Sequence, residues 1–151
     1  MSGILPNKLD AARGVLRRAG LRATAPRLRL LALLEGDRTH PTAADLYARL
    51  RRLDPTVSFA TVYNTLAALE RVGKLRPVDV GGARRFDPFV VAHDHAVCTR
   101  CGAVQDVPTR RRTRPAPLPG FEVERVETIY RGTCGRCQRA RTSMHSRRKE
   151  R

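Results

Sequence analysis

The four cysteines of the chain fall into two pairs with the same spacing. Cys98 and Cys101 form one C-x2-C turn, and Cys134 and Cys137 form the other. Each turn can present two thiolates to one ion, and two such turns supply the four ligands of a closed tetrahedral site. This sulfur set is typical of Zn2+ and leaves no coordination position open for chemistry. The spacing therefore predicts a structural zinc site.

Two redox-active disulfides are the alternative interpretation of the same pairs. A C-x2-C oxidoreductase is typically built into a thioredoxin-like βαβ unit, and the sequence around these cysteines shows no such pattern. We therefore favour a structural ion. Its binding would supply much of the folding free energy of a small β-domain, on the order of 10 kcal/mol.

A second group of possible ligands precedes the first cysteine pair. His93 and His95 alternate as they would on one face of a strand. A third histidine, His40, lies in a turn before a predicted helix, and Asp87 and Asp106 flank the histidine pair along the chain. A histidine pair beside a metal-binding turn favours a second ion.

The first half of the chain has the apolar periodicity of four amphipathic helices. We expect a helix over 8–19 that ends at Gly20, a second capped by Thr24 that runs until Gly36, a third from Thr42 to Asp54, and a fourth from Ser58 to Gly73. The hydroxyl of Thr42, with Asp45 three residues later, should cap the third helix. The apolar rows of the last two helices are expected to be buried: Leu46, Leu50 and Leu53, and Val62, Leu66 and Leu69.

The outer face of the fourth helix is unusual, because its residues are small or hydrogen-bonding rather than Glu and Lys. They are Thr61, Tyr63, Asn64, Ala67 and Ala68. Two short strands, 75–80 and 83–87, follow with Gly81-Gly82 between them, which predicts a hairpin. Arg84 and Arg85 make this hairpin basic, and helices followed by a basic hairpin describe a winged helix-turn-helix. The alternative is an ordinary core helix with a polar outer face.

Beyond Asp87 the pattern changes to short β-branched or aromatic runs, at 95–98, 103–107 and 121–130. Four prolines between 108 and 119 exclude a long helix there and predict a loop. The residues after Cys137 lack an apolar stripe, so we expect them to be disordered. The expected fold class is α+β, with an N-terminal winged helix-turn-helix domain followed by a small α/β domain that holds the four-cysteine zinc site.

The charge of the chain indicates an anionic partner. The 151 residues include 30 Lys and Arg against 14 Asp and Glu, which gives a formal net charge of +16. Nucleic acid is the simplest partner for such a chain. No apolar run approaches the ~18–20 residues that span a bilayer, and the N-terminus lacks the basic-then-apolar pattern of a signal peptide. We therefore expect a cytoplasmic protein with no membrane partner.

Several stretches of the sequence resemble the ferric uptake regulator family of metal-responsive repressors. They are GLRATAPR (20–27), HPTAADLY (40–47), VSFATVYNTLAALERVGKL (57–75), RRFD (84–87), HDHAVCTRCGAVQD (93–106) and IYRGTCGRC (129–137). The combination of TVYNTL with HxHxxCxxCG is particularly specific. The resemblance implies a homodimer in which an N-terminal winged helix binds double-stranded operator DNA and a C-terminal α/β domain dimerises.

The resemblance also implies domain boundaries and ligand sets. The winged-helix domain would span 1–83, the hinge 84–88, the metal-binding dimerisation domain 89–140 and a basic tail 141–151. Structural Zn2+ would lie on the four cysteines, and the regulatory ion on His40, Asp87, His93, His95 and Asp106. An ion bound by all five would close the hinge and set the distance between the recognition helices, so that metal affinity becomes DNA affinity through linkage.

The regulatory ligands, three nitrogens and two oxygens without a thiolate, suit Fe2+ or Mn2+. The two aspartates are similar to the peroxide-stress branch of the family, since the ferric-uptake branch typically has Glu at these positions. In the peroxide-stress branch, bound Fe2+ leaves a position for H2O2 and the resulting oxidant attacks a ligand histidine, here His40 or His93. We therefore expect a metal-dependent transcriptional repressor that senses peroxide.

Two other functions stay open on the sequence alone. An iron or manganese uptake regulator would sense metal sufficiency without redox chemistry. A zinc-ribbon RNA-binding protein would explain the charge and the cysteines, but not the helix at 58–72 with its wing. We do not expect an enzyme, because the open metal site would consume its own ligands and no nucleophile–base pair is apparent.

For DNA, the resemblance places Arg22 in the minor groove and Tyr63 against a thymine in the major groove. Phosphate contacts are expected from Arg27, Arg84 and neighbouring basic groups. The candidate DNA-binding residues are Arg22, Arg27, Ser58, Thr61, Tyr63, Asn64 and Arg84.

Overall fold

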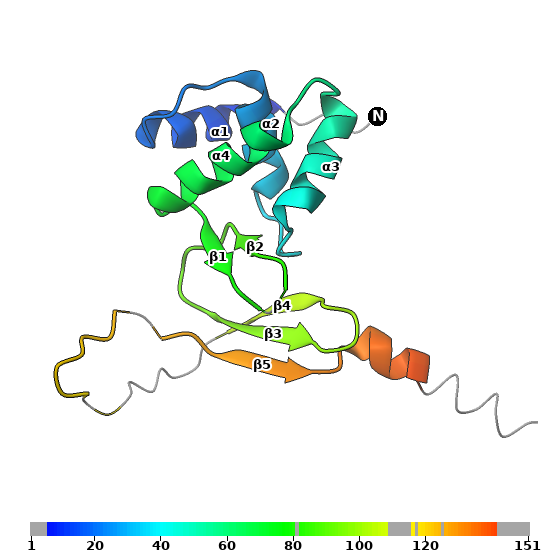
Figure 1. The fold of residues 1–151 in the computed structure, drawn as a ribbon. Helices are drawn as coiled ribbons and strands as arrows, with labels where there is room; N and C mark the ends of the chain where they lie inside the picture. Colours follow the sequence, from blue (N-terminus) through cyan, green and yellow to red (C-terminus); the bar gives the residue numbers. More distant parts are fainter. Residues whose placement is uncertain (1–5, 81, 109–115, 117, 125, 142–151) are drawn as a thin grey trace, which may run out of the picture. The chain divides into compact units, whose positions relative to one another are not determined.

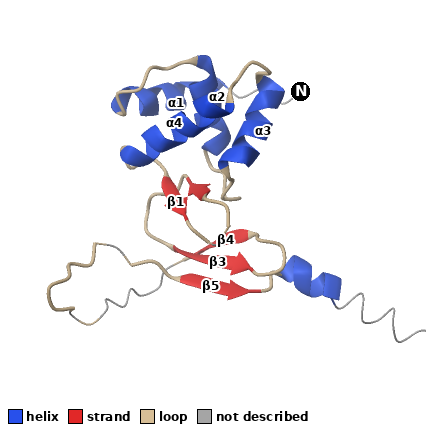
Figure 2. Cartoon of the chain, viewed as in Figure 1, coloured by secondary structure: helices blue, strands red, loops and turns tan. Residues whose placement is uncertain are grey.

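The computed structural model describes residues 6–80, 82–108, 116, 118–124 and 126–141. Contacts divide the chain into two compact units, one up to Val91 and one from Ala92 onwards. In the described residues the first unit contains helices α1 to α4 followed by the antiparallel pair β1–β2. The second contains a three-stranded sheet of β3, β4 and β5, followed by a short helix over 135–141 (Figures 1 and 2).

The first unit is built on a core of leucines. Its helices are α1 (Pro6–Arg18), α2 (Ala25–Leu34), α3 (Ala43–Leu53) and α4 (Phe59–Arg71). Figure 1 shows them gathered together, and α2 packs against each of the other three. The core side chains with at most 1% of their surface exposed include Leu16, Leu30, Leu46, Leu50 and Leu66. None of the helices in the described part of the chain combines the length and the apolar character that crossing a membrane requires.

Local capping explains where α3 and α4 begin. The Thr42 hydroxyl accepts from the backbone N–H of Asp45 at 3.1 Å, and the Asp45 carboxylate accepts from the N–H of Thr42 at 2.9 Å, which completes a capping box. The Ser58 hydroxyl accepts from the N–H of Thr61 in the same way. Thr24 occupies the N-cap position of α2, but its side chain makes no cap hydrogen bond. The predicted N-cap position is therefore confirmed, but the Thr24 side chain contributes no hydrogen bond to the cap.

Two residues differ in exposure from the prediction, one in α3 and one in α4. Leu53 is 40% exposed, whereas Leu46 and Leu50 are buried, because Leu53 lies in the last turn of α3, one residue before its C-cap Asp54. Ala68 is only 6% exposed and belongs to the buried side of α4. The exposed side of α4 in the described residues is thus narrower than the sequence predicted.

The basic hairpin forms, but its turn is longer than predicted. β1 (Arg76–Val78) pairs with β2 (Arg85–Asp87), and the last register pair is Val78 with Arg85. The connection therefore spans residues 79–84 rather than the two glycines 81 and 82, and residue 81 lies outside the described residues. On its other side β2 contacts the segment before α3, where the backbone N–H of Phe86 donates to the carbonyl of Pro41 at 2.9 Å.

The sheet of the second unit has the order β4-β3-β5. The central strand β3 (Asp94–Cys98) runs antiparallel to β4 (Val104–Val107) and parallel to β5 (Ile129–Gly132). The turn between β3 and β4 contains Gly102 at a φ of +69°, a conformation that favours glycine. The parallel pairing places Cys98 opposite Gly132, two residues before the second cysteine pair.

Two expectations for the second unit are wrong. The predicted strand over 121–130 is reduced to β5, because β3 begins at Asp94 and offers no partner for the described residues before 128. Residues 138–141, expected to be disordered, belong to the helix over 135–141. Most of the proline-rich loop and the tail from 142 lie outside the described residues.

The caps provide a test of this fold with a matched control. Thr42→Ala should lower the free energy of unfolding by about 1 kcal/mol, because it removes the hydroxyl that caps α3. Thr24→Ala, at the N-cap of α2, should change it by only a few tenths of a kcal/mol, roughly, because that hydroxyl makes no cap bond. Urea unfolding of the two variants checks the difference, and equal losses would contradict it.

Candidate metal centres

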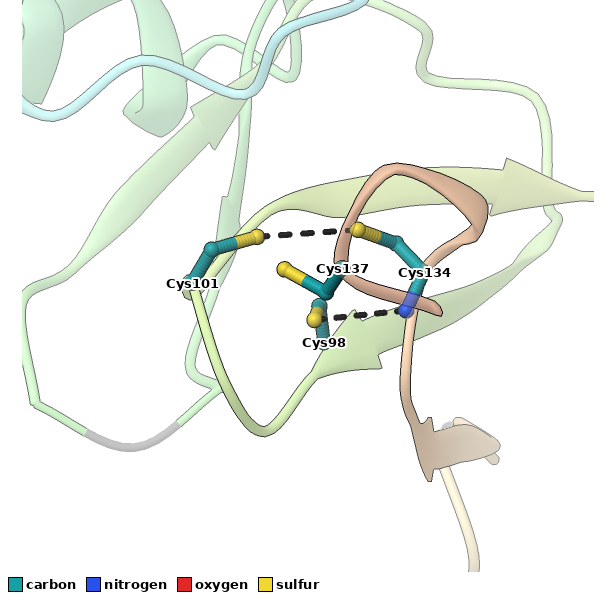
Figure 3. Close-up of side chains that lie close together, drawn as sticks. All are labelled: Cys98, Cys101, Cys134 and Cys137. Atoms are coloured by element: carbon teal, nitrogen blue, oxygen red, sulfur yellow. Dashed lines mark hydrogen bonds between the residues drawn. The ribbon is translucent and has the colours of Figure 1, made fainter. Parts of the chain in front are cut away.

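The four cysteine side chains converge at one end of the β3–β5 pair (Figure 3). Cys98 is the last residue of β3 and Cys101 lies in the following turn. Cys134 follows β5, and Cys137 belongs to the helix over 135–141. All four sulfur atoms lie within 4.8 Å of one another, and none of these cysteines forms a disulfide. The parallel pairing of β3 with β5 thus joins two turns that are 33 residues apart in the sequence.

The spacing of the sulfur atoms fits a tetrahedral zinc ion. Four sulfurs at a Zn–S distance of about 2.3 Å lie roughly 3.8 Å from one another. The Sγ atoms of Cys101 and Cys134 are 3.7 Å apart. A set of four sulfur donors without oxygen or nitrogen is the chemistry that Zn2+ accepts in structural sites. The cysteines therefore fit the ion that the sequence predicts.

Hydrogen bonds prepare part of this cluster for metal binding. The pKa of the Cys98 thiol is lowered to about 6, first because the backbone N–H of Cys134 donates to its sulfur, at 3.3 Å, and next because that of Cys101 does. The pKa of Cys137 is raised to about 12, because its thiol shares hydrogen bonds with the sulfurs of Cys101 and Cys134. A thiolate is the form that binds metal, so Cys98 is already disposed to bind, whereas a cation would have to deprotonate Cys137.

Two candidate regulatory ligands lie in the first unit. Asp87 ends β2 and is fully buried, and His40, in the loop before α3, is 1% exposed. The imidazole Nδ1 of His40 lies 3.1 Å from the carbonyl oxygen of Arg38, and the Asp87 carboxylate accepts from the N–H of Phe89 at 2.8 Å. Buried carboxylates and imidazoles are costly unless they are paired or bind a metal.

The other three candidate ligands lie in the second unit and contact one another. His95 is in β3 and faces Asp106 of β4 in the antiparallel register. The Nε2 atom of His93, which precedes β3, is 3.4 Å from an Asp106 carboxylate oxygen. The rings of His93 and His95 meet edge to face with centroids 4.6 Å apart. The structure therefore brings two imidazoles and one carboxylate together within this unit.

The candidate DNA-binding residues of α4 gather at its N-terminal end. Ser58 caps the helix by accepting from the backbone N–H of Thr61, and the hydroxyls of these two residues share a hydrogen bond at 2.9 Å. Tyr63 is 51% exposed and Asn64 is exposed beside it. Phe59 is also exposed and contacts the ring of Tyr47 edge to face.

The side chains of two basic candidates, Arg27 and Arg84, have partners within the first unit. Arg27 donates to the carbonyl of Arg22 at 3.2 Å, and Arg22 is exposed. Arg84 forms an ion pair at 2.6 Å with Glu70, in the last turn of α4. The side chain of Arg85 contacts the loop before α3, because its guanidinium donates to the carbonyl of His40 at 3.0 Å.

Comparison with known proteins identifies the family. The sequence profile of the ferric uptake regulator family matches residues 18–115. The chain belongs to the ferric uptake regulator family. The Bacillus subtilis (strain 168) "Peroxide operon regulator" is 32% identical to it over 138 residues, which are 88% of this chain and 95% of that protein. The Staphylococcus aureus (strain Mu50) "Peroxide-responsive repressor PerR" is 30% identical over 139 residues, or 89% and 94% of the two chains.

Solved structures of the family have the same fold. The ferric uptake regulator from Pseudomonas aeruginosa with manganese is 28% identical, with a TM-score of 0.63 over 82% of this chain and 98% of that chain. The comparisons confirm the predicted family, the α+β fold class and the similarity to the peroxide-stress branch. This chain is therefore a transcription regulator, which replaces the zinc-ribbon alternative.

Removal of one cysteine tests the zinc site. Cys134→Ser should lose one equivalent of zinc per chain and unfold at a lower temperature, because three thiolates no longer join the two turns. Arg100→Ser, in the same turn as Cys101, changes an exposed residue without removing a ligand and should keep its zinc. Metal analysis and thermal unfolding make the comparison. A zinc-free Cys134→Ser protein with unchanged stability would contradict the structural role.

Proposed function

We propose that this regulator is a metal-dependent DNA-binding repressor that releases its operator when peroxide oxidises a ligand histidine. The observation that carries the proposal is the division of the nitrogen and oxygen donors between the two units. Asp87 and His40 are buried in the unit that contains α4. His93, His95 and Asp106 contact one another in the other unit.

A single Fe2+ or Mn2+ ion, bound by donors from both units, would hold the units together. Three nitrogens and two oxygens without sulfur suit these ions. The segment 84–88 would serve as the hinge between a DNA-binding domain, 1–83, and a metal-binding dimerisation domain, 89–140, with 141–151 as a basic tail. Binding of the ion would then favour one placement of α4 over others, which is the differential affinity that a metal-dependent repressor needs.

Operator DNA would contact the exposed face of α4. Tyr63 would read a base in the major groove, Arg22 would enter the minor groove, and Arg27 and Arg84 would contact phosphates. Two copies of the chain would bind as a homodimer, since a symmetric operator requires two recognition helices. Such a repressor acts where its operator lies, in the cytoplasm, and needs neither a membrane partner nor an enzymatic activity.

Peroxide sensing would depend on the ligand imidazoles. Fe2+, when bound, would lend an electron to H2O2 and regain one from the oxidised ring, so that the iron acts as a catalyst. Overall, one oxygen atom of H2O2 would enter a ring C–H bond of His40 or His93, the ring would lose two electrons, and the second oxygen would leave as water. The oxidised ring is a poorer nitrogen donor, so the hinge opens and the repressor leaves the operator.

A base contact by Tyr63 can be separated from phosphate contacts. Tyr63→Ala should reduce the discrimination between operator and random duplex by about 1–3 kcal/mol, the usual scale of one base contact. Arg27→Gln serves as the control and should weaken binding to both duplexes alike. Binding to an operator selected from a randomised duplex pool measures both. If Tyr63→Ala weakens binding equally on the two duplexes, α4 is not the reading helix.

Peroxide distinguishes the proposed sensor from a sensor of metal sufficiency. Micromolar H2O2 should add one oxygen atom to a peptide that contains His40 or His93 in the Fe2+-loaded protein, and none in the Mn2+-loaded protein. The zinc thiolates should be spared, because the closed site engages their lone pairs. Peptide mass spectrometry and operator binding before and after treatment give the result.

The absence of histidine oxidation would distinguish the two candidate functions. An Fe2+-loaded protein that keeps its DNA and shows no histidine oxidation would exclude peroxide sensing. It would support the second candidate, a regulator of iron or manganese uptake, which the similarity to the manganese-containing structure favours.

A further inference from the structure

One candidate ligand has a strained backbone. His40 has a φ of +50°, and it is the one non-glycine residue with a positive φ in the part of the chain that the structure describes. Side chains with a Cβ rarely adopt this conformation, because the Cβ crowds the neighbouring carbonyl oxygen. Such a conformation persists where its surroundings impose it, and it concentrates at functional sites. We therefore expect contacts with neighbouring residues to hold His40 in this backbone conformation.

The surroundings that hold His40 come from β2. The guanidinium Nη1 of Arg85 donates to the carbonyl of His40 at 3.0 Å, across 45 residues of sequence. The next residue of β2, Phe86, donates its backbone N–H to the carbonyl of Pro41 at 2.9 Å. Thr42 forms an antiparallel bridge with Arg85. The carbonyls of His40 and Pro41 thus accept hydrogen bonds from two successive residues of one short strand.

The same strand carries the second ligand of this unit. Side chains two residues apart on a strand share a face, so Arg85 and Asp87 lie on one side of β2. The arginine that binds the His40 carbonyl and the carboxylate that would bind the ion therefore belong to one rigid element. This arrangement fixes the spacing between the two donors before any ion is present.

We propose that Arg85 is a positioning residue for the regulatory ion. Its side chain holds His40 in the left-handed conformation, in register with Asp87. This inference rests on the proposed function, because it assumes that both residues are ligands. Arg85 suits the role because its planar guanidinium offers several donors in a fixed geometry, and because the group is half-buried. Groups that orient metal ligands from outside the coordination sphere typically change metal affinity 10–100-fold when they are removed.

Mn2+ titration of the full, zinc-containing protein tests the role of Arg85. Arg85→Gln should bind Mn2+ about tenfold or more weakly and keep one zinc per chain, because its amide cannot span the distance to the His40 carbonyl. Arg85→Lys, which keeps a charged donor, should recover part of the lost affinity. If Arg85→Gln does not fold, Arg85→Lys decides the question, since its affinity must then fall measurably below that of the wild type.

Arg29→Gln is the matched control. Arg29 is another half-buried arginine of the first unit, and it forms an ion pair with Asp54 at 2.8 Å. Among the described residues, it makes no hydrogen bond or ion pair with the loop that contains His40. This variant should bind Mn2+ like the wild type even if it unfolds more easily. The proposal is overturned if Arg85→Gln binds Mn2+ as tightly as the wild type, or loses no more affinity than Arg29→Gln.

Two further variants separate this inference from the proposed function. His40→Ala and Asp87→Ala remove the candidate ligands themselves. If both bind Mn2+ like the wild type, the regulatory site is wrongly assigned and the role of Arg85 is wrong with it. If both lose Mn2+ whereas Arg85→Gln does not, the site is supported and the positioning role alone is refuted.

Discussion

Successive side chains of β3 point to opposite faces of the sheet, and the placement of the candidate metal ligands in the second unit depends on this alternation. His95 and Cys98 are three residues apart, so they lie on opposite faces of the strand. Pairing with β4 places His95 opposite Asp106, and pairing with β5 places Cys98 opposite Gly132, just before the second cysteine pair. Soft sulfur donors and harder nitrogen and oxygen donors are therefore kept apart, so that one small sheet carries two candidate sites that suit chemically different ions.

In the first unit, β2 and the residue before it connect the candidate metal ligands with the helices. Three side chains with different roles lie there, at residues 84, 85 and 87. Asp87 is the candidate ligand, Arg85 binds the loop that contains His40, and Arg84, directly before the strand, is paired with Glu70 of α4. A shift at the proposed metal site would thus have a short route to the helix proposed to read DNA. A coupling free energy of about 1–3 kcal/mol gives the 5–150-fold changes in affinity that are common in allosteric proteins.

The features that the sequence predicted well are those set by local contacts. Thr42 and Ser58 cap helices through residues three positions away, and the two C-x2-C turns lead to one cluster of sulfur atoms. The features it predicted poorly depend on where a distant partner ends. The predicted strand over 121–130 is replaced by β5, Ile129–Gly132, because β3 is short, and the pairing of β1 with β2 stops at Val78, before the two glycines. The positive φ of His40 was not predicted, because one of its contacts comes from Arg85, 45 residues away in the sequence. The full regulatory ligand set stays a prediction.

The most direct test of the central claim measures thermodynamic linkage. The claim is that the binding of metal and the binding of DNA are coupled, so that each changes the affinity for the other. The affinity of the zinc-containing protein for its operator should be measured with and without Mn2+, and its affinity for Mn2+ with and without operator. Reciprocity requires both affinities to change by the same factor. We expect a common factor of about tenfold or more, within the range of such couplings. Mn2+ that binds equally well with and without operator DNA would contradict it.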